Sequence, residues 1–180
     1  IKANKDHSHV PMANLLLGRS YLEKKNYQQA TQLLSQALTT PEQVEEATLW
    51  LGRAYARQEL FKEAEEVLKK VQGKVKNPRL APILLFDLAN AHFRQEAFKE
   101  AGEAYGKFLQ QYKEHEQSAA AMKQRVYCLH RTGEHRACVT QCDAFIKQFA
   151  ADEWAHEIAF LRAESLFLEG LKDEASKAFV

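Results

Sequence analysis

The stretch ATLWLGRAYARQELFKEAEEVLKKV, residues 47–71, decides the fold of this chain, because its composition and spacing describe two helices that face each other. It is rich in Ala, Leu, Glu, Lys and Arg, which favour helices, and its apolar residues recur at three- and four-residue intervals. Gly52 and Ala64 are small enough to let two antiparallel helices approach closely. The stretch therefore predicts a helical hairpin.

The same arrangement occurs five times along the chain. When the segments are aligned on the compact residue of each first helix, these residues are 34, 37, 37 and 37 positions apart, and a second small residue follows each one after twelve positions. An internal period of this length is typical of helical repeat arrays. The first set is Gly18, Gly52, Ala89, Val126 and Ala163, and the second is Ala30, Ala64, Ala101, Cys138 and Ala175.

The composition agrees with a helical protein. Only 7 glycines and 4 prolines occur in 180 residues, and no segment alternates apolar and polar residues as a strand does. Lys+Arg 25 nearly balances Asp+Glu 24, so no strong field is available to attract nucleic acid. The apolar runs are shorter than the about 20 residues that cross a membrane. We expect an all-α protein without a membrane span.

The pattern resembles that of tetratricopeptide-repeat proteins, which stack helix-turn-helix units of about 34 residues. Arg125 and Arg162 depart from it, because they stand where the family has Leu. The resemblance implies a right-handed superhelical solenoid of about five antiparallel repeats. It is carried by Leu17, Gly18, Tyr21, Leu51, Gly52 and Tyr55. The expected organisation is a flexible leader at 1–9 and an array at 10–180, with units at about 11–44, 45–81, 82–118, 119–155 and a truncated 156–180.

The three longer units also resemble repeats of bacterial cell-envelope proteins, such as outer-membrane assembly lipoproteins and Tol-Pal-associated proteins. They share aromatic-rich second helices, as in FLQQY and FIKQF, followed by a longer linker. The compartment stays open between the cytoplasm and the periplasm or cell envelope. Because the chain starts at Ile1 without Met and stops at Val180 inside an expected helix, we expect a processed or excised form of a longer protein.

Two segments carry helix-start signals. Thr40-Pro41-Glu42-Gln43 resembles a capping box, with Thr40 as the N-cap, Pro41 at the first helical position and Gln43 reaching back. Asn77-Pro78 repeats the device before the third unit. Both predict where a first helix begins.

First helices of such arrays line a concave groove, so the family resemblance implies a binding surface beside the compact residues. This surface would combine apolar and aromatic side chains with arginines, which suits an extended or helical peptide with hydrophobic anchors and acidic neighbours. Alternatively, some of these residues cover helix ends or pack between units. The expected groove residues are Leu15, Arg19, Leu49, Arg53, Arg57, Phe86, Asn90, Phe93, Arg94, Lys123, Tyr127 and Arg131.

The leading hypothesis is a non-enzymatic scaffold that binds a partner protein or peptide in this groove. Two alternatives stay open: a helical repeat that binds single-stranded RNA, and a structural subunit of a larger assembly through stacked repeats. The near-neutral charge, with Glu23 and Glu164 in the groove, argues against RNA. Chaperone-binding members of the family hold a partner's C-terminal carboxylate with a clamp of Lys and Asn. The corresponding positions here are Leu15, Arg19, Trp50, Ile83 and Asp87, so we expect no binding to heat-shock chaperone tails.

No catalytic constellation, metal site or cofactor site is expected. The chain has no phosphate loop, dinucleotide fingerprint or nucleophile elbow, and HEIAF at His156 lacks the second histidine of a zinc-protease helix. His7 and His9 could chelate a metal weakly, but no third ligand is near them, and they are expected in a mobile leader. The chain is therefore expected not to be an enzyme.

The stretch HRTGEHRACVTQCDAFIKQF, residues 130–149, holds two histidines and two cysteines. In the repeat alignment Cys138 takes the place of the small Ala of the second helix, and Cys142 that of a larger core residue. Both are thus expected to pack as small hydrophobic residues. His130 is expected to point toward the groove and His135 to take an aromatic position at the start of the second helix. The four side chains would then go to different places and hold no zinc.

Overall fold

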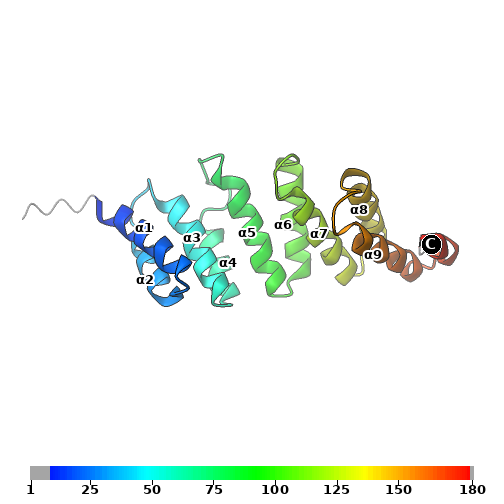
Figure 1. Ribbon diagram of the computed structural model, residues 1–180, viewed down its shortest axis with the longest axis horizontal. Coiled ribbons are helices and arrows are strands. Elements are labelled where there is room, and N and C mark those ends of the chain that lie inside the picture. The colour runs from blue at the N-terminus through cyan, green and yellow to red at the C-terminus, as the bar shows by residue number, and fades with distance from the viewer. Residues whose placement is uncertain (1–8, 179–180) are drawn as a thin grey trace, which may run out of the picture. The chain divides into compact units, whose positions relative to one another are not determined.

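The computed structural model describes residues 9–178, and within this range the chain forms ten α-helices and no strand (Figure 1). The expectation of an all-α protein is confirmed. Residues 1–8, which include His7, and residues 179–180 lie outside the described range. The helices are α1 (Val10–Glu23), α2 (Tyr27–Ala37), α3 (Val44–Arg57), α4 (Phe61–Lys69), α5 (Leu80–Arg94), α6 (Phe98–Gln111), α7 (Ser118–Arg131), α8 (His135–Gln148), α9 (Ala155–Leu168) and α10 (Lys172–Ala178).

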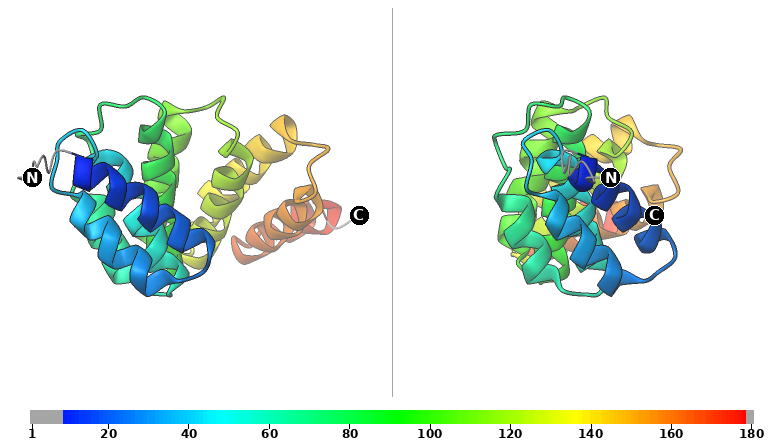
Figure 2. Two further views of the ribbon diagram at one scale, coloured as in Figure 1. Left: turned by 60° about the vertical axis from the view of Figure 1, so that its left-hand side comes forward. Right: turned by 90° about the vertical axis from the view of Figure 1, so that its left-hand side faces the viewer.

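The helices pack as hairpins within two compact units, one reaching to Ala91 and the other starting at His92. In the first unit α1 contacts α2 and α3 contacts α4, and α1 and α2 lie side by side in Figure 2. In the second unit α7 contacts α8, and α9 contacts α10. Each hairpin also contacts the next within its unit, as α2 does with α3 and α8 does with α9. Each unit is therefore a stack of helix-turn-helix elements.

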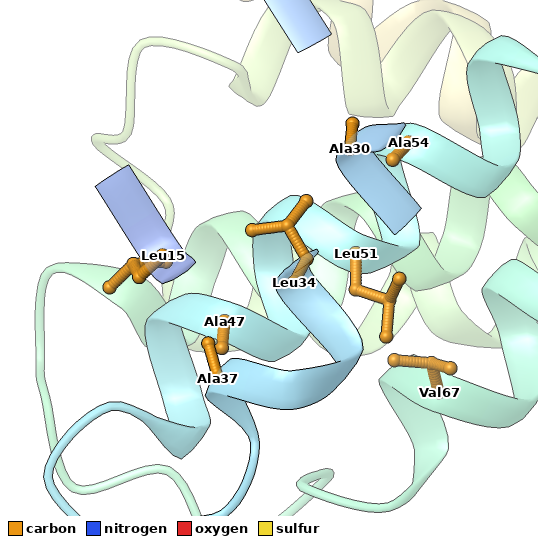
Figure 3. Close-up of a cluster of buried hydrophobic side chains, with 8 residues drawn as sticks. All are labelled: Leu15, Ala30, Leu34, Ala37, Ala47, Leu51, Ala54 and Val67. Carbon is orange, nitrogen blue, oxygen red and sulfur yellow. The ribbon is translucent and has the colours of Figure 1, made fainter. Parts of the chain in front are cut away.

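The core of the first unit forms where the repeat alignment placed the small residues. The cluster shown in Figure 3 joins α1, α2, α3 and α4, and it includes the alanines Ala30, Ala37, Ala47 and Ala54. An ideal Cβ on Gly18 would lie 2.6 Å from Cγ of Leu34, and one on Gly52 would lie 2.9 Å from Cγ of Leu68. These two glycines therefore allow a helix approach that a side chain would block.

The core of the second unit contains the cysteines. Cys138 and Cys142 are fully buried with Val126 and Phe145, which confirms that both pack as small hydrophobic residues. All three thiols are free and buried. Burial raises the pKa of Cys128 to about 12, and the bond to Cys138, together with burial, raises the pKa of Cys142. Both shifts disfavour the thiolate, which is the nucleophilic form of a cysteine.

The turn inside each hairpin contains one residue with a left-handed backbone. The alignment places these residues seven positions after the compact residue of the first helix in all five repeats. Glycine, which adopts positive φ without strain, occupies the position in the last two repeats only. The residues and their φ angles are Lys25 (61°), Glu59 (62°), Glu96 (59°), Gly133 (76°) and Gly170 (84°).

The helix-start predictions have mixed outcomes. The capping box at Thr40 is wrong, because α3 begins at Val44 and its N-cap is Gln43. The Thr40 carbonyl accepts the N–H groups of Gln43 (3.2 Å) and Val44 (3.1 Å), which closes a separate turn before the helix. At Asn77 the side-chain oxygen accepts the N–H of Arg79 at 3.0 Å. Asn77 therefore does bond the chain ahead of α5.

Candidate functional site

Three of the expected groove residues, Leu15, Leu49 and Phe86, are buried. The prediction that they face a groove is wrong. Leu15 lies in the cluster that includes Ala47 and Leu51 of α3, and Leu49 lies in one that includes Leu84 and Leu88 of α5. The side chain three residues before the compact residue therefore packs against the first helix of the next hairpin. Sequence spacing alone did not distinguish this position from those expected to face the groove.

The other nine expected residues are accessible to different degrees. Arg57, Arg94 and Arg131 are exposed at the ends of their helices. The half-buried residues are Arg19, Arg53, Asn90, Phe93, Lys123 and Tyr127.

Trp50 is the centre of a side-chain cluster in the first unit. The guanidinium carbon of Arg19 lies 4.6 Å from the centre of its ring, and that of Arg53 lies 5.3 Å from it. Such distances allow cation–π attraction to the indole. The groove residues expected from the alignment do not include Trp50, although it directly follows Leu49 and precedes the compact residue Gly52 by two positions.

Carboxylates of the protein already pair with these arginines. Arg19 Nη1 donates to Glu46 Oε1 at 2.8 Å, and Trp50 Nε1 donates to the same oxygen at 3.3 Å. Arg53 Nε donates to Asp87 Oδ2 at 2.6 Å. Each carboxylate comes from the first helix of the next hairpin, so these pairs join successive first helices. The repeat alignment gave no signal for these pairs, since Asp87 follows Arg53 by 34 residues, whereas the compact residues Gly52 and Ala89 of the two repeats are 37 positions apart.

Asp87 shows that this cluster is partly removed from water. Burial raises the pKa of its carboxyl group, and the charge and hydrogen bond of Arg53 lower it by less. The charged form is thus disfavoured by its surroundings and is held by one cation. Loss of Arg53 would remove the cation that pairs with this carboxylate.

The second unit has a similar cluster around Glu157. Lys123 Nζ pairs with Glu157 Oε2 at 2.7 Å, and the Tyr127 hydroxyl donates to Oε1. The hydrogen bond from Lys123, followed by that from Tyr127, lowers the pKa of Glu157. The same bond to Glu157 raises the pKa of Tyr127 to about 12. Lys123 Nζ also lies 4.7 Å from the ring centre of Trp154.

Aromatic contacts close the turn between α6 and the helix before it. The rings of Phe93 and Phe98 meet edge to face with centres 5.6 Å apart, and the guanidinium of Arg131 lies 4.7 Å from the centre of Phe98. Arg131 therefore already has an aromatic partner. Phe93 contributes to packing as well as to the accessible surface.

The two histidines of the 130–149 stretch meet, contrary to expectation. The ring centres of His130 and His135 are 5.8 Å apart, and His130 Nε2 lies 3.3 Å from Glu164 Oε2. The expectation that they go to different places is wrong, because they take the same two positions as Phe93 and Phe98 on either side of a hairpin turn. Within residues 9–178, no group of three His, Cys, Asp or Glu side chains is arranged to hold a metal ion.

Comparison with known proteins identifies the type of fold. A family model for the tetratricopeptide repeat matches residues 21–84. The chain is similar to the crystal structure of the MamA protein, with a TM-score of 0.80 and 20% identity over 96% of this chain and 89% of that one. It is also similar to YrrB, described as a TPR protein with an unusual peptide-binding site, with a TM-score of 0.78 and 16% identity over 98% and 87%. Among curated proteins nothing matches.

These similarities confirm the expected fold class, an all-α array of tetratricopeptide-type helix-turn-helix repeats. They do not test the resemblance to repeats of bacterial cell-envelope proteins, which stays a prediction. In the part of the chain that the structure describes, no helix is both long and apolar enough to cross a membrane.

Proposed function

We propose that this chain is a non-enzymatic scaffold that binds a partner peptide segment across the first helices of its repeats, with Arg19, Trp50 and Arg53 at the centre of the site in the first unit. The observation that carries the proposal is the stacking of two guanidinium groups on one half-buried indole. Tryptophan and arginine are the residue types most enriched where binding energy concentrates.

The ion pairs support binding rather than prevent it. A guanidinium group has five N–H donors, and the bonds to Glu46 and Asp87 engage Arg19 through Nη1 and Arg53 through Nε. The remaining donors can bond carbonyl or carboxylate oxygens of a partner. Because the internal pairs hold both side chains in place, less conformational entropy is lost on binding than for free arginines.

The chemistry favours a peptide with a hydrophobic anchor and oxygen acceptors beside it. YrrB, whose fold this chain shares, is described as having a peptide-binding site, which supports this class of partner. Single-stranded RNA is the less favoured partner, because the formal net charge is only +1 and Glu46 and Asp87 neutralise the two arginines. Within the first unit, the flanking contacts that we propose are Arg57 and Asn90. Within the second unit, taken by itself, the partner-binding residues that we propose are Phe93, Arg94, Lys123, Tyr127 and Arg131.

The test starts from peptides selected from a displayed random library on the purified chain. In a Trp154→Phe background Trp50 is the single tryptophan, so its fluorescence reports binding at this cluster. We expect selected peptides to change Trp50 emission and to bind Arg19→Ala at least about tenfold more weakly, a loss of about 1.4 kcal/mol.

The matched control is Arg136→Ala, which removes a cation paired with Glu169 at 2.8 Å on a different helix surface. It should leave peptide affinity unchanged. Selected peptides that bind Arg19→Ala and Trp50→Phe as tightly as the parent would show that the cluster is not the binding surface.

A further inference from the structure

The connection between α4 and α5 is strongly basic, although the chain as a whole has a formal net charge of only +1. The stretch KKVQGKVKNPR, residues 69–79, contains five cationic residues, and no Asp or Glu occurs from Val67 to Phe86. We call residues 69–79 the basic segment. Its cationic residues are all exposed: Lys69, Lys70, Lys74, Lys76 and Arg79. Charge concentrated in this way can attract an anionic partner that the net charge of the chain would not.

The connections between the other hairpins have the opposite sign. With histidine neutral, residues 38–43 and 112–117 each carry a charge of −1 and residues 149–154 carry −2, whereas residues 70–79 carry +4. All of these segments join the second helix of one repeat to the first helix of the next. The positive charge is therefore not a requirement of the repeat but a property of this one connection.

The basic segment is anchored to the first unit through its backbone and its apolar side chains. Val71 is buried, and Val75 packs against the hydrophobic cluster of α3, α4 and α5. The carboxylate of Glu45 accepts the N–H of Lys76 at 2.6 Å and that of Asn77 at 3.0 Å. Because both valines pack toward the core, the side chains that the segment presents to solvent are polar or cationic, apart from the ring of an exposed proline.

Most of these cations are not neutralised by the protein itself. Lys69 pairs with Glu65, one turn earlier on α4. Among residues 9–178, no ion pair engages the other four, which are Lys70, Lys74, Lys76 and Arg79. Four positive charges on one anchored loop can therefore act together on an external anion.

We propose that the basic segment binds the surface of a lipid membrane that contains anionic headgroups. Each Lys or Arg brought close to such a surface strengthens binding about fivefold, so several cations acting together give measurable association. Four of the five cations are lysines, whose compact charge needs no planar, bidentate acceptor and suits headgroups that are mobile in the bilayer. The contact is peripheral, and it does not depend on the peptide binding proposed above.

The composition of the basic segment favours a membrane over two other anionic partners. Single-stranded nucleic acid is usually held by aromatic side chains that stack on its bases, and residues 69–79 contain no Phe, Tyr, Trp or His. An acidic peptide would need an apolar pocket or anchor beside the charges, but Val71 and Val75 pack inward. Recognition by charge alone fits a surface that presents many headgroups at once.

The experiment is co-sedimentation of the 180-residue chain with phosphatidylcholine vesicles that contain either no acidic lipid or about 30% phosphatidylserine. We expect binding only to the acidic vesicles, and weaker binding as the ionic strength rises from about 0.05 to about 0.5 M. Lys74→Gln should weaken binding about fivefold, and Lys74→Gln with Lys76→Gln about twenty-fivefold. Both side chains are exposed, so circular dichroism should show unchanged helix content.

The matched control is the double variant Lys62→Gln with Lys99→Gln. It removes the same total charge from two exposed lysines that occupy equivalent positions, in the FKEA sequences that begin α4 and α6. It should leave vesicle binding within about twofold of the parent, because a cation outside the contact adds little to the attraction. If a substitution in the basic segment lowers helix content, Lys70→Gln and Arg79→Gln replace it in the same measurement.

Three results would overturn the proposal. The first is a parent chain that does not sediment with acidic vesicles at low ionic strength, or that binds neutral vesicles equally well. The second is an equal loss of binding in the two double variants, which would mean that total charge and not the basic segment is responsible. The third is preferential binding to poly-dT or to polyglutamate at matched charge concentration, which would make the segment a site for nucleic acid or for an acidic peptide.

Discussion

Replacing Gly18 by alanine tests whether close approach of the two helices in a hairpin decides the stability of the first unit. The added Cβ would lie 2.6 Å from Cγ of Leu34, 2.9 Å from its Cδ2 and 3.3 Å from its backbone nitrogen. The first distance is far below normal carbon contact of about 3.5–4.0 Å. Leu34 is fully buried and cannot swing into solvent, so α1 and α2 must move apart or adopt strained rotamers.

Two opposing terms set the magnitude. Overpacking a core costs about 1–3 kcal/mol, while alanine in place of glycine inside a helix returns about 1 kcal/mol. The net expectation is a loss of about 1 kcal/mol in the free energy of unfolding. Gly106→Ala is the matched control, because the three atoms nearest to its Cβ would all belong to the flexible side chain of Arg125, with Nε at 3.3 Å. There the helix gain should dominate, and stability should rise by about 0.5–1 kcal/mol.

Urea unfolding measures both variants, each in a background with one tryptophan. Trp50 reports the first unit when Trp154 is replaced by Phe, and Trp154 reports the second unit in the reverse background. Gly18→Ala should lower the transition midpoint of the first unit, and adding Leu34→Val should recover part of the loss by making room. If Gly18→Ala were as stable as the parent, or gained as much as Gly106→Ala, helix approach would not be limited by this contact.

Three further predictions follow from the ion pairs and the turns. Arg53→Ala should destabilise the first unit by about 1–3 kcal/mol at neutral pH, because Asp87 stays buried and charged. Burial raises the pKa of Asp87, so the folded state keeps the carboxyl proton to a higher pH than the unfolded state does, and the free energy of unfolding falls as pH rises above 3.8. The loss of stability caused by Arg53→Ala should therefore shrink in acid, which urea unfolding at several pH values would show. Glu157→Gln should lower the phenol pKa of Tyr127 from about 12 toward its ordinary value, 10.0, as an ultraviolet titration would show. The hydrogen bond from Tyr127 to Glu157 stabilises the fold below pH 10.0, and its contribution is lost as pH rises toward 12. Glu59→Gly should raise stability by up to about 1 kcal/mol in thermal unfolding, because φ is 62° there, and an unchanged or lower midpoint would contradict the assignment of strain.

Much of the fold could be predicted because one periodic signal was repeated five times. Small residues at Gly18 and Ala30, and again at Gly52 and Ala64, mark helix faces that touch, and the structure buries all four. The same alignment correctly assigned Cys138 to packing. Local capping was harder, as Thr40 showed, because a turn and a helix start use the same residue types.

The candidate site was predicted only in part. Arg19 and Arg53 lie on the first helices as expected, but the alignment gave no sign that carboxylates of the next hairpin pair with them. Leu15 was assigned to the groove and is buried instead. Positions one turn apart on a helix differ little in sequence pattern, whereas the next helix covers one and leaves the other open.

By itself, then, the amino-acid sequence determined the class of fold, the hairpin period and the residues at which helices approach, since these depend on side-chain size and on helical spacing that neighbouring repeats reinforce. Only the tertiary structure decided which charges meet, which of the expected groove residues are buried and that His130 lies beside His135. Those outcomes depend on how one hairpin is placed against the next. That placement comes from the packing of whole helices, which no single repeat encodes.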